Sequence, residues 1–410
     1  MDVLHAHCCG IDVHAKFLVA CCRHIGPTGS VTKTSRTFGT MTADLEARGA
    51  WLQSEAVTHV AIESTGVLWQ PVWNILEPAV TIVLVNPRDV RQVPGRKTDV
   101  TDADWLAQLL QYGLLRGSFV PPTVIRELRD LTRGRAKLVD QTTAVTNRIH
   151  AVLHDANIKL GSVASDILGV SGRAMLQAIV DGETDPHRLA DLARRSLRRK
   201  LAALRLALEG RVTAHHRFLL RRLLGQLAFL EAEIAVYDER IVEASRPVVA
   251  ILARLDTIPG VNRRTAENVF AEVGPDMRVC PTVQHLASWV AICPGNHETG
   301  GKSQKGTTRH GNRWARRAFT EAAWAAKNTR STYAAAQFRR LAARRGVKRA
   351  VVAVAHSLLV ATYHIIRDDV TYRELGPDHF DRLAPTQLTR YLVKRLERLG
   401  HKVTLAAAAA

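Results

Sequence analysis

The sequence has neither a long apolar segment nor a leader of the kind that marks membrane or secreted proteins. Its longest apolar stretch, Val351–Ile366, includes two histidines and a serine and is short for a bilayer span. The first residues, MDVLHAHCCGID, contain no basic segment followed by an apolar one, so we expect no signal peptide. The expected protein is cytoplasmic and does not enter a membrane.

Cysteine is scarce, and its spacing does not suit a metal site. The six cysteines are two adjacent pairs and two single residues, and no CxxC occurs: Cys8, Cys9, Cys21, Cys22, Cys280 and Cys293. Adjacent residues on a strand point to opposite faces, so neither pair can present both thiolates to one metal. We interpret them as small buried residues in a reducing compartment.

Acidic residues are too few to balance the basic ones, and the imbalance is uneven along the chain. The 410 residues include 57 Lys+Arg and 38 Asp+Glu, a net charge of +19. Residues 1–120 hold 10 Lys+Arg and 11 Asp+Glu, which leaves 47 and 27 for residues 121–410. A hydrophobic content of 46% excludes a disordered basic tail. The second part therefore has the charge of a nucleic-acid-binding protein, or, alternatively, a merely solvated basic face.

The first 120 residues follow the pattern of an α/β domain. Two strands are expected within residues 7–24, a third near 35–40, and further short strands at 58–64 and 80–86. Helices are expected at 43–54, at 68–75 and from near Asp99. Three consecutive strands followed by alternating helices and strands predict a mixed or parallel sheet with helical layers.

Beyond Pro121-Pro122 the pattern is helical. Apolar residues recur in steps of four and three from Val124 to Val152 and again from Leu220 to Ala244. These heptad seams predict two long helices that pack together, within the chain or across a dimer. Between them, residues 188–222 hold 11 Lys+Arg and 2 Asp+Glu.

A third region begins near residue 251. Asp256–Gly274 reads as two helices joined by a turn at Pro259-Gly260, in the manner of a helix-hairpin-helix. In that motif the glycine lets the turn approach a phosphate, which the amides of the next helix then bind. The following segment, residues 302–349, has 14 Lys+Arg and one acid, Glu321.

Acidic side chains stand where apolar ones are expected. Asp12 lies within the first strand and Glu63 at the end of an apolar strand, positions that are costly for a carboxylate that binds nothing. Asp99 and Asp102 are one helical turn apart at the start of a helix, where capping is the alternative role. Together these carboxylates suit Mg²⁺ and two-metal phosphodiester chemistry.

The segments GIDVHAK, AIESTG and KTDVTDA, in this order, resemble the RNase-H-like (resolvase-like) domain of DEDD transposases, the recombinases of the "one-ten" family of bacterial insertion sequences. IPGVNRRTAENVFAEVG and the segment from LASWVAICPGNHETGGKSQKGTTRHGNRW onward resemble that family's C-terminal transposase domain. The resemblance covers nearly the whole chain. It makes Asp12, Glu63, Asp99 and Asp102 the acidic tetrad that binds Mg²⁺.

The resemblance further implies what the protein does. Members of the family recombine donor and target DNA with the DEDD site and a serine that forms a covalent phosphoserine link. They are guided by a non-coding bridge RNA and assemble as homodimers into tetramers. The implied architecture is an α/β RNase-H-like domain (1–120), a helical coiled-coil region (121–250), a mainly α transposase domain (251–375) and a tail (376–410).

One motif departs from the family pattern. Where the family has H-x-S-G-G-K, this chain reads His-Glu-Thr-Gly-Gly-Lys at 297–302, so Thr299 occupies the nucleophile position. Thr299 is the preferred nucleophile, with Ser303 as a substitute and an inactive copy as the third possibility. The basic residues around this motif are expected to neutralise phosphates: Lys302, Lys305, Arg309, Arg313, Arg316 and Arg317.

Overall fold

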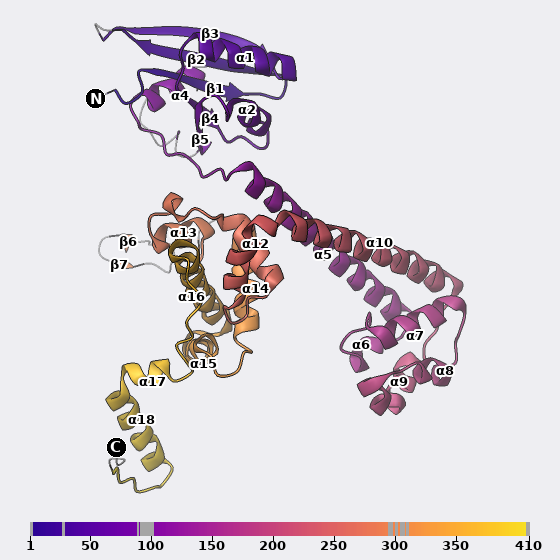
Figure 1. Ribbon diagram of the computed structural model, residues 1–410. Coiled ribbons are helices and arrows are strands. Elements are labelled where there is room, and N and C mark those ends of the chain that lie inside the picture. The colour runs from indigo at the N-terminus through magenta and orange to yellow at the C-terminus, as the bar shows by residue number, and fades with distance from the viewer. Residues whose placement is uncertain are drawn as a thin grey trace. The chain divides into compact units, whose positions relative to one another are not determined.

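The computed structural model describes residues 3–26, 29–87, 90, 102–293, 298–299, 302–303, 308 and 311–406. The chain divides into two compact units, Met1–Pro121 and Pro122–Ala410, here called unit 1 and unit 2 (Figure 1). Unit 1 contains a five-stranded sheet, and unit 2 is almost entirely helical. The expected α/β front and helical rear are confirmed.

The sheet of unit 1 has the strand order β3-β2-β1-β4-β5. The first three strands form an antiparallel meander, and β4 and β5 run parallel to β1. The strands are β1 (His7–Val13), β2 (Phe17–Ile25), β3 (Val31–Gly39), β4 (His59–Glu63) and β5 (Thr81–Val85). The helices described in this unit are α1 (Thr42–Ser54), α2 (Trp69–Leu76) and α4 (Asp102–Gln111).

The two faces of the sheet are covered by different helices. Cys9, Ile11 and Val13 of β1 pack into a core with residues of α1 and α2. On the other face, Cys8 shares a core with Ala61 of β4 and with leucines of α4. Alternation along β1 therefore directs Gly10 and Asp12 toward the α4 side.

The prediction that the cysteines are buried is correct for the four in unit 1, whereas Cys280 and Cys293 in unit 2 are half-buried. Both adjacent pairs in unit 1 are buried, and all six cysteines are free. Burial raises the pKa of the Cys8 thiol to about 12, so at neutral pH it stays protonated as a small apolar group.

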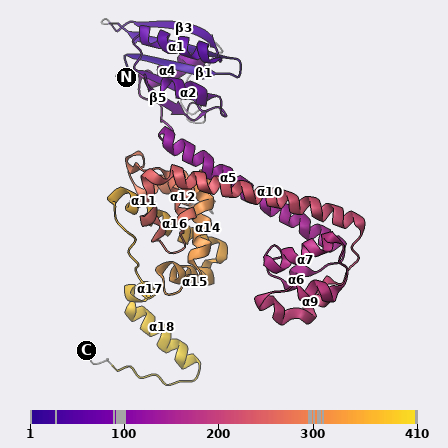
Figure 2. The same ribbon diagram turned by 45° about the vertical axis from the view of Figure 1, so that its right-hand side comes forward.

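Two long helices, α5 (Thr123–Asp155) and α10 (Ala214–Ala244), lie side by side in both views (Figures 1 and 2). Gly134 allows this approach, because a Cβ there would lie 2.6 Å from the ring of Tyr237. The predicted seam of α10 is correct, since Leu220, Leu227 and Leu230 are buried.

The predicted seam of α5 is wrong at its first turn. Val124 is 55% exposed, whereas Ile125 is buried. Ile125 and Leu128 belong to a core with helices from the C-terminal half of the unit. Contacts with these helices, and not the heptad period, therefore decide which residues of the first turn of α5 are buried.

Unit 2 contains two hydrophobic cores, one toward each end of the α5/α10 pair. The distal core joins the pair to α6 (Leu160–Val163), α7 (Val170–Asp181), α8 (Pro186–Asp191) and α9 (Leu201–Leu208). The proximal core joins it to α11 (Val249–Asp256), α12 (Arg263–Val273), α13 (Val283–Val290), α14 (Arg313–Ala326), α15 (Tyr333–Arg345) and α16 (Val347–Asp368). The helices α17 (His379–Leu383) and α18 (Pro385–Arg398) follow.

Helix α16 is long and apolar enough to cross a membrane by length and composition alone. It is the central helix of the proximal core, with residues such as Val354, Leu358 and Leu359 buried against other helices. Its composition is therefore that of a core helix.

The turn at Pro259-Gly260 joins α11 to α12 as the sequence predicts. The turn needs a glycine, however, for a reason other than the predicted approach of a phosphate. Gly260 has φ +86°, and a Cβ there would lie 2.6 Å from the carbonyl oxygen of Ala322 on α14. Asn262 caps α12 by accepting a hydrogen bond from the amide of Thr265. Close helix packing thus accounts for this glycine, which corrects the interpretation that it admits a phosphate.

Candidate functional site

Two of the predicted acidic residues lie next to each other at one end of the sheet. The parallel register pairs Gly10 with Ala61 and Ile11 with Ile62, so Asp12 and Glu63 are the next residues along the two strands. Register partners on parallel strands point to the same face, which here is the α4 face. The sheet therefore brings the carboxylates of Asp12 and Glu63 to one edge and one face.

Helix α4 runs antiparallel to β1 and begins near this edge. The Cys8 thiol donates to the carbonyl oxygen of Ala107 at 3.4 Å. Two residues further along β1, a Cβ at Gly10 would overlap the backbone oxygen of Ala103. Moving from Cys8 toward Asp12 thus leads toward the start of α4, where Asp102 lies.

His14 is a neighbour of Asp12 that the sequence analysis missed. Its Nε2 lies 3.1 Å from Oδ2 of Asp12, and the Asp12 side chain is 25% exposed. The His14 ring also lies against Phe17, with centroids 4.6 Å apart. The signal was present in GIDVH, because residues two apart in extended chain share a face, and His14 directly follows the last residue of β1.

The donor set fits a hard divalent cation in its chemistry. Carboxylate oxygens are the ligands that Mg²⁺ takes, and Asp12 and Glu63 supply them from adjacent strands. Asp99 lies outside the described residues. Among the residues that are described, no three His, Cys, Asp or Glu side chains are close enough to hold a metal ion.

Asp104, two residues after Asp102, has a structural role. Its carboxylate pairs with Arg23 of β2 and accepts a hydrogen bond from Lys33 of β3 at 2.7 Å. Burial opposes its charge, but the hydrogen bonds from Lys33 and Arg23 outweigh this and lower the pKa of Asp104. These contacts fix α4 on the sheet and so hold the start of the helix beside β1.

The segment predicted to carry the nucleophile includes a short antiparallel pair, β6 (Glu298–Thr299) and β7 (Lys302–Ser303). The register places Thr299 opposite Lys302 and Glu298 opposite Ser303. The two candidate nucleophiles are thus on facing strands of one hairpin. Lys305 and Arg309 lie outside the described residues.

The arginines of α14 have different surroundings. Arg313 is exposed and lies over the Trp314 ring, 5.0 Å from its centroid. Arg316 donates to the hydroxyl of Thr308 at 2.8 Å. Arg317 pairs with Asp140 of α5 and with Glu321. Arg313 is therefore the arginine of this group that the described contacts leave most available to a phosphate.

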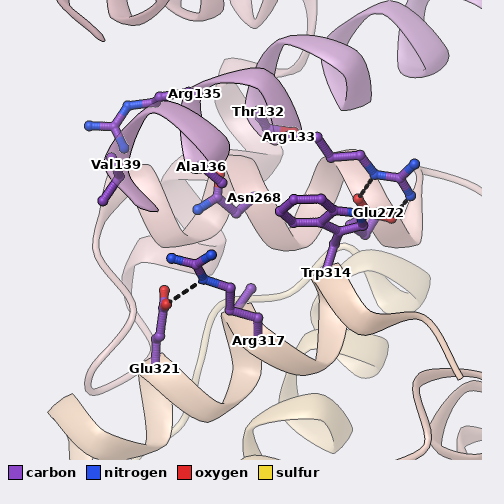
Figure 3. Close-up of a pocket in the computed structure, with 11 residues that line it drawn as sticks. Thr132, Arg133, Arg135, Ala136, Val139, Asn268, Glu272, Trp314, Arg317 and Glu321 are labelled. Atoms are coloured by element: carbon purple, nitrogen blue, oxygen red, sulfur yellow. Dashed lines mark hydrogen bonds and ion pairs between the residues drawn. The ribbon is translucent and has the colours of Figure 1, made fainter. Parts of the chain in front are cut away.

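A pocket of about 120 Å³ lies between α5, α12 and α14 (Figure 3). Its wall includes the Trp314 ring, and each of its arginines pairs with an acid: Arg133 with Glu272, Arg317 with Glu321, and Arg135 with Asp238 of α10. The remaining lining residues include Thr132, Ala136, Val139, Asn268 and Ala318. With its charges already paired, the pocket does not have the excess positive charge of an anion site.

Comparison with known proteins supports one family over both ends of the chain. A family model described as "Transposase", of the DEDD type of IS110, matches residues 9–158. A second, described as "Transposase IS116/IS110/IS902 family", matches residues 252–339. Together the two matches span more than half of the chain.

A curated relative gives the same result. The chain is 26% identical over 248 residues to a "Probable family 20 transposase" of Pseudomonas aeruginosa. The match covers 60% of this chain and 64% of the relative.

Proposed function

Because the chain belongs to the insertion-sequence transposases of the IS110 type, we propose that it is a DNA recombinase. In this proposal unit 1 is an RNase-H-like domain whose DEDD residues bind Mg²⁺, and the β6/β7 hairpin supplies the nucleophile. Because the curated relative is matched over part of its length, the activity is inferred from this chain's own residues.

The observation that carries the proposal is the juxtaposition of Asp12 and Glu63 at the edge of the sheet where α4 begins. Mg²⁺ would be held there by Asp12, Glu63, Asp99 and Asp102. When bound, it activates the attacking oxygen and stabilises the leaving oxygen of a phosphodiester. His14 Nε2 contacts Oδ2 of Asp12 and so restricts the orientation of this carboxylate. The Asp104 ion pairs hold α4 in place, so that Asp102 remains at the edge.

Thr299 is the proposed nucleophile. Its hydroxyl oxygen forms a bond to phosphorus while the bond from phosphorus to one deoxyribose oxygen breaks, and the hydroxyl proton ends on the leaving oxygen. The product is a threonine phosphodiester that a second DNA end can resolve by the reverse reaction. Lys302, opposite Thr299 in the hairpin, is suited to neutralise the phosphate.

The proposed partners are donor DNA, target DNA and a bridge RNA, in a cytoplasmic complex. The positive charge of residues 121–410 supports binding of polyanions. RNA recovered from the purified protein and sequenced should map beside the gene. Recovery of only unrelated cellular RNA would contradict the proposal that the protein binds a bridge RNA.

A homodimer that assembles into a tetramer is also proposed. Helix α10 exposes Phe218, Phe229 and Val236, which are 57%, 62% and 59% exposed. Large apolar side chains on a long exposed helix support contact with another copy of the chain.

The experiment that tests the proposed function is a search for a covalent protein–DNA adduct. Labelled element-end DNA is incubated with RNA-loaded protein and Mg²⁺, then separated by denaturing electrophoresis. We expect an adduct that Thr299→Ala removes and Ser303→Ala retains. The opposite result would transfer the role to Ser303.

A second candidate function, a hydrolytic junction resolvase, is favoured by the presence of threonine at position 299. The methyl group of Thr299 crowds in-line attack at phosphorus, and a hydrolytic junction resolvase needs no such attack. Mg²⁺-dependent cleavage without any adduct would support this resolvase. Binding without cleavage under any condition would indicate an inactive copy.

A further inference from the structure

Glu272 on α12 is a buried carboxylate at the meeting point of three helices. Its side chain is 2% exposed. Arg133 of α5 donates to both of its oxygens, from Nε at 2.6 Å and from Nη2 at 2.8 Å (Figure 3). Asn312, just before α14, donates from Nδ2 to the same carboxylate at 2.6 Å. Glu272 therefore connects α5 to the start of α14.

Asn312 stands at the base of the segment that carries Thr299. Its Oδ1 caps α14 by accepting from the amides of Trp314 and Ala315, both at 3.0 Å. The backbone amide of Asn312 donates to the carbonyl oxygen of Trp289 on α13 at 3.0 Å. The end of α13 and the start of α14, which flank residues 294–310 in the sequence, are thus joined by this hydrogen bond.

A second arginine fixes the end of α12 on the same long helix. Arg129 of α5 donates to the carbonyl oxygens of Ala271 and Glu272, at 3.0 and 2.7 Å. These are carbonyls of the last turn of a helix, which need a partner outside it. Residues 271 and 272 therefore cannot move relative to α5 without breaking these two part-buried hydrogen bonds.

We propose that Glu272 is a positioning residue for the nucleophile. It fixes the base of segment 294–310 to α5, so that the attack geometry of the β6/β7 hairpin depends on the position of this long helix. The proposal rests on the proposed function, since it takes the nucleophile to lie in this segment. It holds for either Thr299 or Ser303, because both belong to the same hairpin.

The chain contains a matched control. The Glu272 carboxylate pairs with Arg133 and, at 3.5 Å, with Nε of Arg129. Glu267 lies on the same helix, its side chain is 1% exposed, and it likewise pairs with two arginines, Arg263 and Arg264. Its hydrogen bonds go to these two residues of its own helix. Glu267→Gln and Glu272→Gln therefore both remove a buried paired charge, but only the second affects the bond to Asn312.

The experiment measures two properties of full-length protein. The first is hydrogen exchange at the amides of Trp314 and Ala315, which report the cap at the base of the segment. The second is the single-turnover rate of adduct formation at saturating DNA, with DNA affinity and the unfolding midpoint measured beside it. Asn312→Ser is included, because serine can still cap α14 but is too short to reach Glu272.

For Glu272→Gln we expect faster exchange at both amides and adduct formation slowed about 100-fold, the effect of a displacement of about 1 Å. Asn312→Ser should slow the adduct in the same direction, and DNA affinity should change less than about threefold in both. Glu267→Gln should lower the unfolding midpoint but leave both measurements near wild type.

Equal losses in Glu267→Gln and Glu272→Gln would overturn the proposal, because they would show a purely structural effect. Unchanged exchange at Trp314 and Ala315 in Glu272→Gln would also overturn it, whether or not an adduct forms. A wild-type protein that forms no adduct would contradict the proposed covalent mechanism. In that case the exchange measurement would still decide whether Glu272 holds the base of the segment.

Discussion

Gly10 is the position where one added carbon should disturb both the fold and the site. In Gly10→Ala the new Cβ would lie 2.5 Å from the backbone nitrogen of Ala107 and would also overlap the oxygen of Ala103. Both are backbone atoms of α4, which cannot rotate away as a side chain can. Because the Ala103 oxygen would lie 2.1 Å from the new Cβ, the helix must move outward by more than about 1 Å to reach an ordinary contact distance of about 3.5 Å.

The expected cost follows from this displacement. Overpacked cores lose about 1–3 kcal/mol, and a clash with two backbone atoms belongs at the upper end. Asp102 at the start of α4 moves with the helix. A shift of about 1 Å in a catalytic group can lower the rate about 100-fold. Gly10→Ala should therefore destabilise unit 1 by about 3 kcal/mol and nearly abolish DNA strand cleavage.

The assay is urea unfolding followed by hydrogen exchange of the α4 amides, with strand cleavage measured in parallel. Gly225→Ala on α10 is the matched control, because a Cβ there has no atom within 4 Å. As a glycine inside a helix, it should stabilise the protein by about 1 kcal/mol when replaced. If Gly10→Ala unfolds and cleaves like wild type, the packing of α4 on β1 is wrong.

Three further predictions concern ion pairing, assembly and helix packing. Asp104→Asn should cost roughly 2 kcal/mol at pH 7, since it leaves the buried Arg23 partly unpaired. The pKa of Asp104 is lower in the folded than in the unfolded chain, so its stabilisation is present at neutral pH and lost as the pH falls through that lowered value. Urea midpoints of wild type and variant should therefore converge in acid, and a constant difference down to pH 2 would refute the pairing. Phe229→Glu, at a 62% exposed site, should weaken self-association by sedimentation without lowering the unfolding midpoint; an unchanged oligomeric state would exclude this face of α10. Gly260→Ala should cost about 3 kcal/mol by urea unfolding, because its Cβ would meet the α14 backbone, and a wild-type midpoint would contradict that packing.

The sequence predicts the strands of unit 1 and the position of Asp12 and Glu63 because these depend on local patterns. Alternation and chain order already place the two carboxylates at the ends of buried strands. The chain order alone does not say that β4 lies beside β1, which the parallel register establishes.

The ion pairs that stabilise the surroundings of the proposed site could not be predicted from local sequence patterns. Arg23 and Asp104 are 81 residues apart, and Arg133 and Glu272 are 139 apart. In the sequence, Asp104 and Glu272 look like ordinary helical residues, because the arginines that pair with them are far away along the chain. The error at Val124 has the same origin, since Ile125 is buried by helices that follow more than a hundred residues later.

In the proposed mechanism, the edge formed by Asp12, Glu63 and the start of α4 performs metal-dependent DNA cleavage. This claim is tested most directly by strand cleavage in Mg²⁺ with Asp12→Asn, Asp102→Asn and Asp104→Asn. Asp102 and Asp104 are two residues apart on one helix, but Asp104 is paired with Arg23 and Lys33. We expect the first two variants to lose at least about 100-fold in rate with DNA binding retained. Asp104→Asn removes no proposed metal ligand and only loosens α4, so it should lose clearly less rate than Asp102→Asn. Normal cleavage by Asp12→Asn or Asp102→Asn would contradict the claim.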